Sequence, residues 1–171
     1  MKIERIFMIF VGMLTFFLVT ACSKSEEPII NVQFKISPIS AEEYRVIGTK
    51  ELNNPKQTDF QKINYKLRIT NTNTIKNLKI HSYDDWKKAL GDTDDIKRYW
   101  FGNIMEEERP TENSIEHKAK IIFYAKGLSE KELKAKFKNA HTTVSWTDKN
   151  NKKVNQQFQL SEIMEFKKTK Y

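Results

Sequence analysis

The sequence predicts a mainly β protein, an antiparallel β-sandwich with one or two short helices. Apolar residues recur at every second position along residues 32–36, 63–69 and 119–125, and this period is typical of strands with one face on a core and one toward water. About seven such short stretches follow one another without the strand–helix–strand rhythm of a parallel sheet. Together, these two observations favour two antiparallel sheets packed face to face.

The other strands are short or form a hairpin. The short candidates are residues 44–49, 77–82 and 98–104. Near the C-terminus, Val144 and Trp146 lead into the polar stretch 147–152, after which residues 154–160 alternate again. This order predicts a β-hairpin, because Asp and Asn tolerate the backbone conformations of turns. Since Trp146 alternates with Val144 on one strand face, we expect it to be the core tryptophan.

Two helices interrupt the strands. Ser129 and Glu132 have the spacing of a capping box, in which each side chain bonds the backbone N–H of the other residue. A second helix is predicted from Ser82, with Trp86 inside it and Gly91 as a left-handed cap at its end. Both segments are short enough to bridge strands across an edge of the sandwich.

The order of these elements resembles that of Ig-like modules in exported Gram-positive lipoproteins. A strand is followed by a capped helix, then by a hairpin, then by a short apolar segment at Ile163 and Met164. The resemblance rests on this pattern rather than on a motif. It implies an Ig-like β-sandwich and brings no functional residues with it.

The start of the chain has the parts of an export signal. Lys2 and Arg5 give a positive beginning, and an apolar stretch follows at 6–19. The string Leu18-Val19-Thr20-Ala21-Cys22 resembles the bacterial lipobox, in which a signal peptidase cuts before a cysteine that carries a diacylglyceryl group. The resemblance implies cleavage after Ala21 and lipidation of Cys22 by acyl chains such as palmitate.

Two other interpretations of this segment stay open. It can be an uncleaved N-terminal membrane helix, or an ordinary secretory signal cut near Ala21 that leaves Cys22 as a free thiol. The apolar run is short for the roughly 20 residues that span a bilayer as a helix, and this favours cleavage.

The predicted organisation is a signal peptide at 1–21, a lipidated tether at 22–28, a single sandwich domain at 29–166 and a basic tail at 167–171. The mature chain of about 150 residues is long enough for the core of one domain. Because Cys22 is the only cysteine, the domain can form no internal disulfide. A diacylglyceryl anchor at Cys22 would hold the domain on the outer face of the cell membrane, and the Lys-, Asn- and Ile-rich composition favours a Gram-positive cell.

The chain is basic, with a net charge of +8 that falls to +7 when Lys2, Glu4 and Arg5 leave with the signal peptide. Lysines cluster near turns and at the C-terminus, where they attract anionic lipid headgroups or cell-wall polymers. The alternative is that they keep edge strands from pairing and the protein soluble. We expect no nucleic-acid partner, because the domain lies outside the cell and carries no nucleic-acid-reading motif.

The sequence shows no constellation typical of catalysis, and we expect no catalytic residue, metal or cofactor. None of the five glycines frames a serine, the sole cysteine is expected to be lipidated, and no phosphate loop is present. The three histidines, His81, His117 and His141, lack metal-ligand spacing.

Two acidic groups also have ordinary interpretations. Asp92, Asp94 and Asp95 do not form a calcium loop, because Lys97 occupies the position at which an EF-hand needs glycine. We interpret them as a solvated turn after Gly91. The glutamates at 106–108 are expected to form an exposed loop.

The aromatic triplet Tyr99-Trp100-Phe101 is the candidate contact surface. Consecutive side chains of a strand point to opposite faces, so at least one of the three should lie outside the core. The competing interpretation is that a helix or loop packs over the second face.

Together, the export signal, the lack of a catalytic constellation and the aromatic triplet lead us to expect a non-catalytic, lipid-anchored module that binds a protein or an anionic envelope partner. The alternative is an immunity or exclusion lipoprotein that protects the cell against a toxin, a phage or a conjugation apparatus.

Overall fold

The computed structural model describes residues 27–91 and 96–167, with the backbone alone at 103–106. It is mainly β, as the alternation predicts. The strands within these ranges are β1 (Ile29–Pro38), β2 (Phe60–Thr70), β3 (Lys76–His81), β4 (Tyr99–Thr111), β5 (Ser114–Tyr124), β6 (His141–Thr147), β7 (Lys153–Gln159) and β8 (Met164–Phe166). The helices are α2 (Ala41–Val46), α3 (Trp86–Leu90) and α4 (Glu130–Lys136), with 3-10 turns η1 (Gln57–Asp59) and η2 (Thr72–Thr74).

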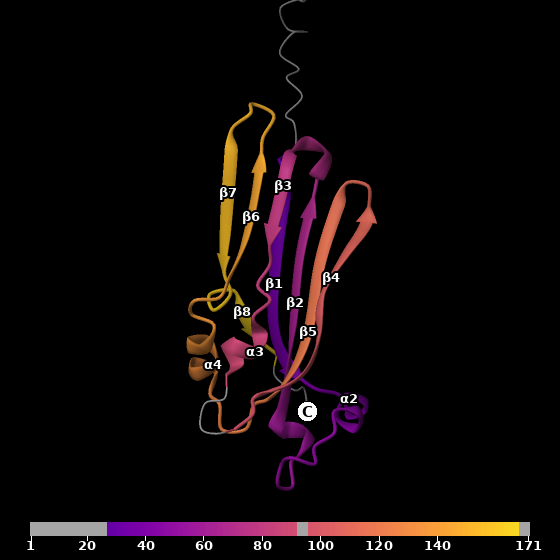
Figure 1. Cartoon of the computed structure of the whole chain (residues 1–171), viewed down its shortest axis with the longest axis vertical. Coiled ribbons are helices and arrows are strands. Elements are labelled where there is room, and N and C mark those ends of the chain that lie inside the picture. Colours follow the sequence, from indigo (N-terminus) through magenta and orange to yellow (C-terminus); the bar gives the residue numbers. More distant parts are fainter. Residues whose placement is uncertain (1–26, 92–95, 168–171) are drawn as a thin grey trace, which may run out of the picture.

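The strands form two layers (Figure 1). One sheet has the order β4-β5-β2-β1-β8 and the other has the order β3-β6-β7. If β1 to β7 are lettered A to G, these orders become D-E-B-A and C-F-G, which is the strand order of a constant-type Ig domain. The sandwich is therefore Ig-like. The short strand β8 is an addition that pairs parallel to β1, from Phe34–Met164 to Ile36–Phe166.

The core lies between the sheets and is closed at one end by α3 and α4. Phe34 of β1 and Phe137, which follows α4, are fully buried, with ring centroids 5.1 Å apart. Trp86 of α3 is 4% exposed and lies 6.0 Å from Phe34 and 5.6 Å from Tyr65, measured between ring centroids. Trp86 is therefore the core tryptophan. Trp146, which the alternation predicts in that role, does pack against the same core, but it lies at the other end of the sandwich and is only half-buried.

A buried hydrogen bond joins the two layers. The Tyr65 hydroxyl of β2 lies 2.8 Å from the Thr142 hydroxyl of β6, and burial raises the pKa of Tyr65. In antibody domains a disulfide links the equivalent strands B and F. This chain, with a single cysteine, uses a polar side-chain contact between the same two strands.

Most predicted elements are confirmed. The strands expected at 77–82 and 98–104 correspond to β3 and to the start of β4. The C-terminal hairpin is β6–β7, and Asn151 in its turn has a φ of 59°. The capping box is present, since the Ser129 hydroxyl accepts from the Glu132 N–H at 3.2 Å and the Glu132 carboxylate accepts from the Ser129 N–H at 2.8 Å. Gly91 follows α3 with a positive φ of 56°, as expected, but its ψ of 158° lies outside the left-handed helical region. The helix itself begins at Trp86 rather than at Ser82.

Two local predictions are wrong. The stretch 44–49 is not a strand, because α2 covers its beginning. This helix starts at a second capping box, in which Ser40 and Glu43 bond each other's backbone N–H groups. The glutamates at 106–108 belong to β4 rather than to a loop. In the first segment the capping box favours a helix over the strand that its apolar residues suggest. In the second, pairing with β5 places the three glutamates in a strand despite their charge.

Other predictions concern residues outside the described ranges. These are the signal peptide, Cys22 and the tether as far as residue 26, and also Asp92, Asp94, Asp95 and the end of the basic tail. Across 27–91 and 96–167, the structure has no helix that is long and apolar enough to cross a membrane.

Candidate functional site

The two ends of the sandwich differ, and the candidate site lies at one of them. β1 begins beside the β6–β7 turn, since Pro28, Trp146 and Lys149 line one hollow. We call this the proximal end. The helices α2, α3 and α4 lie at the opposite end, which we call the distal end (Figure 1).

The structure separates the three residues of the aromatic triplet. Tyr99 is half-buried and packs against the main core. Trp100 packs against a second apolar cluster, and its Nε1–H donates to the carbonyl oxygens of Ile47 at 2.7 Å and Gly48 at 3.1 Å. Phe101 is 55% exposed. The segment around Ile47 covers Trp100 on the outer face of the sheet, as the competing interpretation predicts. The Phe101 ring remains at the surface.

The second cluster lies on the outer face of the five-stranded sheet. Phe60, Ile122 and Tyr124 form its floor, and Ile39 and Ile47, which flank α2, cover it. The signal for this cluster is visible in the sequence, because Ile122 and Tyr124 are apolar at positions of 119–125 where a one-sided strand has polar residues.

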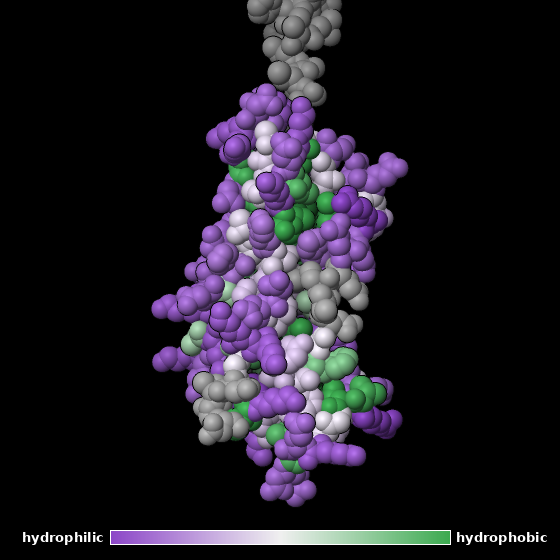
Figure 2. All heavy atoms as spheres, viewed as in Figure 1, coloured by the Kyte–Doolittle hydropathy of each residue, from purple (hydrophilic) through white to green (hydrophobic). Residues whose placement is uncertain are grey.

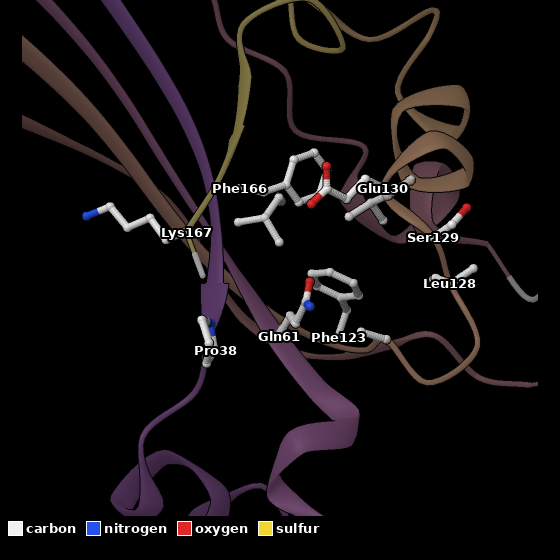
Figure 3. A pocket seen from close by; sticks show the side chains of 11 residues that line it. Pro38, Gln61, Phe123, Leu128, Ser129, Glu130, Phe166 and Lys167 are labelled. Carbon is white, nitrogen blue, oxygen red and sulfur yellow. The ribbon is translucent and has the colours of Figure 1, made fainter. Parts of the chain in front are cut away.

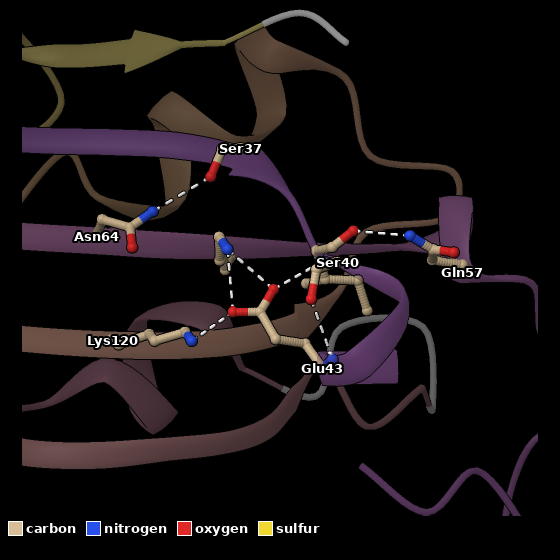
Figure 4. Close-up of polar contacts among 8 residues, drawn as sticks. Ser37, Ser40, Glu43, Gln57, Asn64 and Lys120 are labelled. Atoms are coloured by element: carbon tan, nitrogen blue, oxygen red, sulfur yellow. Dashed lines mark hydrogen bonds and ion pairs between the residues drawn. The ribbon is translucent and has the colours of Figure 1, made fainter. Parts of the chain in front are cut away.

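Glu43 fastens α2 to the sheet (Figure 4). Its carboxylate accepts from the Lys62 amine of β2 at 2.8 and 2.9 Å, from Lys120 of β5, and from the Ser40 N–H at 2.7 Å. Burial disfavours the charged carboxylate, but the hydrogen bonds from Lys120, Lys62 and the Ser40 N–H outweigh burial and lower the pKa of Glu43 to about 2. The helix is thus held by an ionised group at neutral pH.

This attachment leaves two apolar side chains in water. Val46, the last residue of α2, is 78% exposed, and Phe101 is 55% exposed. Their chain neighbours, Ile47 and Trp100, are joined by the Trp100 hydrogen bond. Figure 2 shows apolar surface over α2 near the lower end of the molecule. We call Val46, Trp100 and Phe101 the distal apolar surface.

A cavity of about 490 Å³ opens at the same end, between the sheet and α4. Phe123, Leu133 and Phe166 give it apolar walls, and Glu130 adds one carboxylate to the lining. In Figure 3 the rings of Phe123 and Phe166 lie at this space, whereas the Lys167 side chain leads away from it. The lining contains no histidine and no cysteine, and its chemistry suits an apolar group of a ligand or partner.

One polar constellation was not predicted from the sequence. The His117 Nδ1 lies 2.9 Å from the Ser82 hydroxyl, and its Nε2 lies 3.5 Å from a Glu107 carboxylate oxygen. Ser82 also interacts with the Tyr65 hydroxyl, which bonds Thr142. The contacts therefore run from Thr142 of β6 through Tyr65 of β2 and Ser82 after β3 to His117 of β5, and they tie the layers together. The His117 Nε2 is buried and makes no hydrogen bond to a described residue, and Glu107 of β4 is the carboxylate beside it. Sequence spacing could not reveal this constellation, because its members come from five separate segments.

Metal binding finds no support in the described ranges. His81 and His141 are exposed, and no three His, Cys, Asp or Glu side chains among the described residues gather in a way that could hold a metal ion.

Comparison of the chain with protein-family models, with curated proteins and with solved structures found no match. Strand order alone relates this fold to Ig domains. Folds of this type carry many unrelated functions, so the function must be argued from the surface described above.

Proposed function

We propose that the protein is a membrane-anchored, extracytoplasmic lipoprotein whose Ig-like domain binds a protein partner without catalysing a reaction. The observation that carries this proposal is the distal apolar surface, which exposes Val46 and Phe101 at the end remote from the start of β1. Lipidation of Cys22, followed by a short tether, would turn the proximal end toward the bilayer. The distal surface would then face away from the membrane.

The build of this surface supports a role in binding. Single exposed apolar residues are ordinary, but here Val46 and Phe101 are each the chain neighbour of a residue, Ile47 or Trp100, that belongs to one packed cluster and one hydrogen bond. Aromatic residues are enriched at the centres of protein interfaces. A partner that covered Phe101 would remove its ring from water, and the rigid frame would limit the entropy lost on binding.

The test is a crosslinking pull-down from intact cells, comparing the wild-type protein with a Val46→Ser/Phe101→Ser variant. Both side chains are exposed, so we expect the variant to fold, and circular dichroism and the urea midpoint would test this. Ile29→Ser is the matched control, because Ile29 is 63% exposed but lies at the proximal end. We expect a specific protein to be captured by the wild type and the control and lost from the double variant.

Equal capture by all three proteins would contradict a role for the distal apolar surface. The identity of the captured protein decides the biological role. A toxin, or a component of a phage or conjugation apparatus, would assign the protein to immunity or exclusion.

A further inference from the structure

Five lysines gather at the proximal end. Lys76 and Lys79 lie on β3, and Lys149, Lys152 and Lys153 lie in or beside the β6–β7 turn. All five are exposed, and none of them has an ion pair with another described residue. Lysines on the outer face of the five-stranded sheet differ in this respect. Those with ion pairs there are Lys35, Lys62, Lys66, Lys118 and Lys120.

The β6–β7 turn holds its lysines on a fixed frame. One carboxylate oxygen of Asp148 accepts from the backbone N–H groups of Asn150 and Lys152, both at 2.8 Å. The Asp148 N–H donates to the Lys152 carbonyl oxygen at 2.9 Å. The acidic side chain is therefore engaged by the backbone of the turn. Glu27 and Asp148 line the same hollow as Lys149 and Lys152, and Glu112 lies in the β4–β5 turn. The arginines of the neighbouring strands, Arg68 and Arg109, are each paired with a glutamate, so the five lysines are the cations of this end that have no ion pair with a described residue.

The chain enters the domain beside these lysines. Glu27 and Pro28 share a hollow of about 460 Å³ with Trp146, Lys149 and Lys152. Five residue steps separate Cys22 from Glu27, and a fully extended chain covers at most about 3.6 Å per residue, or about 18 Å. A lipid at Cys22 would thus keep Glu27 within about 18 Å of the headgroups. Because one Debye length at physiological salt is about 8 Å, the lysines beside Glu27 would be attracted to the headgroups whenever the tether is less than fully extended.

We propose that the proximal end docks on anionic phospholipid headgroups through Lys76, Lys79, Lys149, Lys152 and Lys153, with Trp146 beside them. This inference rests on the proposed membrane anchoring and adds a second contact to it. Juxtamembrane lysines are attracted to anionic leaflets, and tryptophan is enriched at the level of the headgroups. Docking would restrict the tilt of the domain and hold the distal apolar surface away from the bilayer.

The test uses the full-length protein and vesicles of two compositions, phosphatidylcholine alone or with 30% phosphatidylglycerol. Co-flotation with phosphatidylcholine vesicles measures anchoring. An amine-reactive reagent followed by mass spectrometry measures the accessibility of each lysine. We expect the five proximal lysines to be labelled at least about threefold more slowly on phosphatidylglycerol vesicles, and this protection to disappear in 0.5 M salt because screening weakens the attraction.

Two charge variants make the test specific. Lys149→Gln/Lys152→Gln/Lys153→Gln should abolish the protection of Lys76 and Lys79. The matched control, Lys131→Gln/Lys134→Gln/Lys138→Gln, removes three exposed lysines in or next to α4 at the distal end and should leave the protection unchanged.

The outcomes separate docking from anchoring. Flotation with both vesicle types but equal labelling would overturn docking and leave anchoring intact. Flotation with phosphatidylglycerol vesicles alone, lost in the triple proximal variant, would support docking and contradict the lipid anchor. A further sample contains phosphatidylcholine vesicles and soluble polyphosphate. If the five lysines are protected from labelling there as strongly as on phosphatidylglycerol vesicles, the partner is an anionic polymer and not a phospholipid.

Discussion

At the scale of single residues, partly buried polar groups fix the position of surface segments that the main apolar core does not contact. Glu43 is the clearest case, because one carboxylate receives two lysine amines and a backbone N–H. It connects α2 to β2 and β5. The position of Val46 therefore depends on an ion pair formed about one helical turn earlier.

Glu43→Gln should lower the free energy of unfolding by about 1–2 kcal/mol at pH 7, because a partly buried charged hydrogen-bond network is lost. The pKa of Glu43 is lowered from 4.5 to about 2 in the folded protein, so its contribution is present above about pH 4.5 and is lost as the pH falls toward 2. Urea unfolding should therefore show a difference between wild type and variant that shrinks over this range. Glu162→Gln, at an exposed residue, is the control, and a pH-independent difference would contradict the assignment.

A second residue-scale prediction concerns the bond between the layers. Tyr65→Phe leaves the buried Thr142 hydroxyl without this partner and should lower the free energy of unfolding by about 1–2 kcal/mol. Adding Thr142→Val should cost less than the sum of the two single changes, since the pair is then removed together. Tyr83→Phe, which removes an exposed hydrogen bond to the Asp85 carbonyl oxygen, should cost at most about 0.5 kcal/mol. Strict additivity in chemical denaturation would show that the two hydroxyls do not interact.

At the scale of elements, the sequence predicts whatever depends on local spacing. Strand faces follow a period of two residues, so β1, β2 and β5 could be located from alternation alone. The Ser129 capping box could be located because both of its partners lie within four residues. The same rule would have located α2 from Ser40 and Glu43, but Tyr44 and Val46, two residues apart, imitate a strand.

The site could be predicted only in part for the same physical reason. The triplet at 99–101 signals that an aromatic ring lies outside the core. Which ring it is depends on Ile47, about fifty residues away in the chain, whose carbonyl oxygen binds Trp100 and leaves Phe101 in water. The burial of Trp86 in place of Trp146 likewise depends on where α3 packs, and no local pattern specifies that.

The two capping serines give a prediction that separates stability from binding. Ser40→Ala and Ser129→Ala should each lower the free energy of unfolding by about 1 kcal/mol, because each removes a side-chain acceptor for a helical N–H. Only Ser40→Ala should also weaken partner capture, since α2 carries Val46. Urea midpoints and capture yields measured on the same preparations test both statements. Equal loss of capture in Ser129→Ala would place the binding surface elsewhere.

At the scale of the whole molecule, the ends of the sandwich would have different partners. Five lysines without ion pairs among the described residues and the start of β1 lie at the proximal end, and the exposed pair Val46 and Phe101 lies at the distal end. The proposed anchor at Cys22 would place the proximal end toward the membrane. The domain would act as a spacer of fixed length that presents its distal apolar surface away from the bilayer.

The direction itself is testable through Cys22. In the proposed lipoprotein the diacylglyceryl group would be attached to the Cys22 sulfur, so Cys22→Ser should abolish labelling by radioactive palmitate and block cleavage before residue 22. Wild-type protein should carry the label, have a mass consistent with removal of 1–21, and remain with the membranes after a high-salt wash. Ser23→Ala, the adjacent change outside the lipobox string, should behave as the wild type. Unlabelled wild-type protein that keeps residues 1–21 and stays with the membranes would instead mean an uncleaved helix. In that case the proximal lysines would still face the bilayer, because the direction in which the chain leaves the domain is the same, but Cys22 would have no part in holding them there.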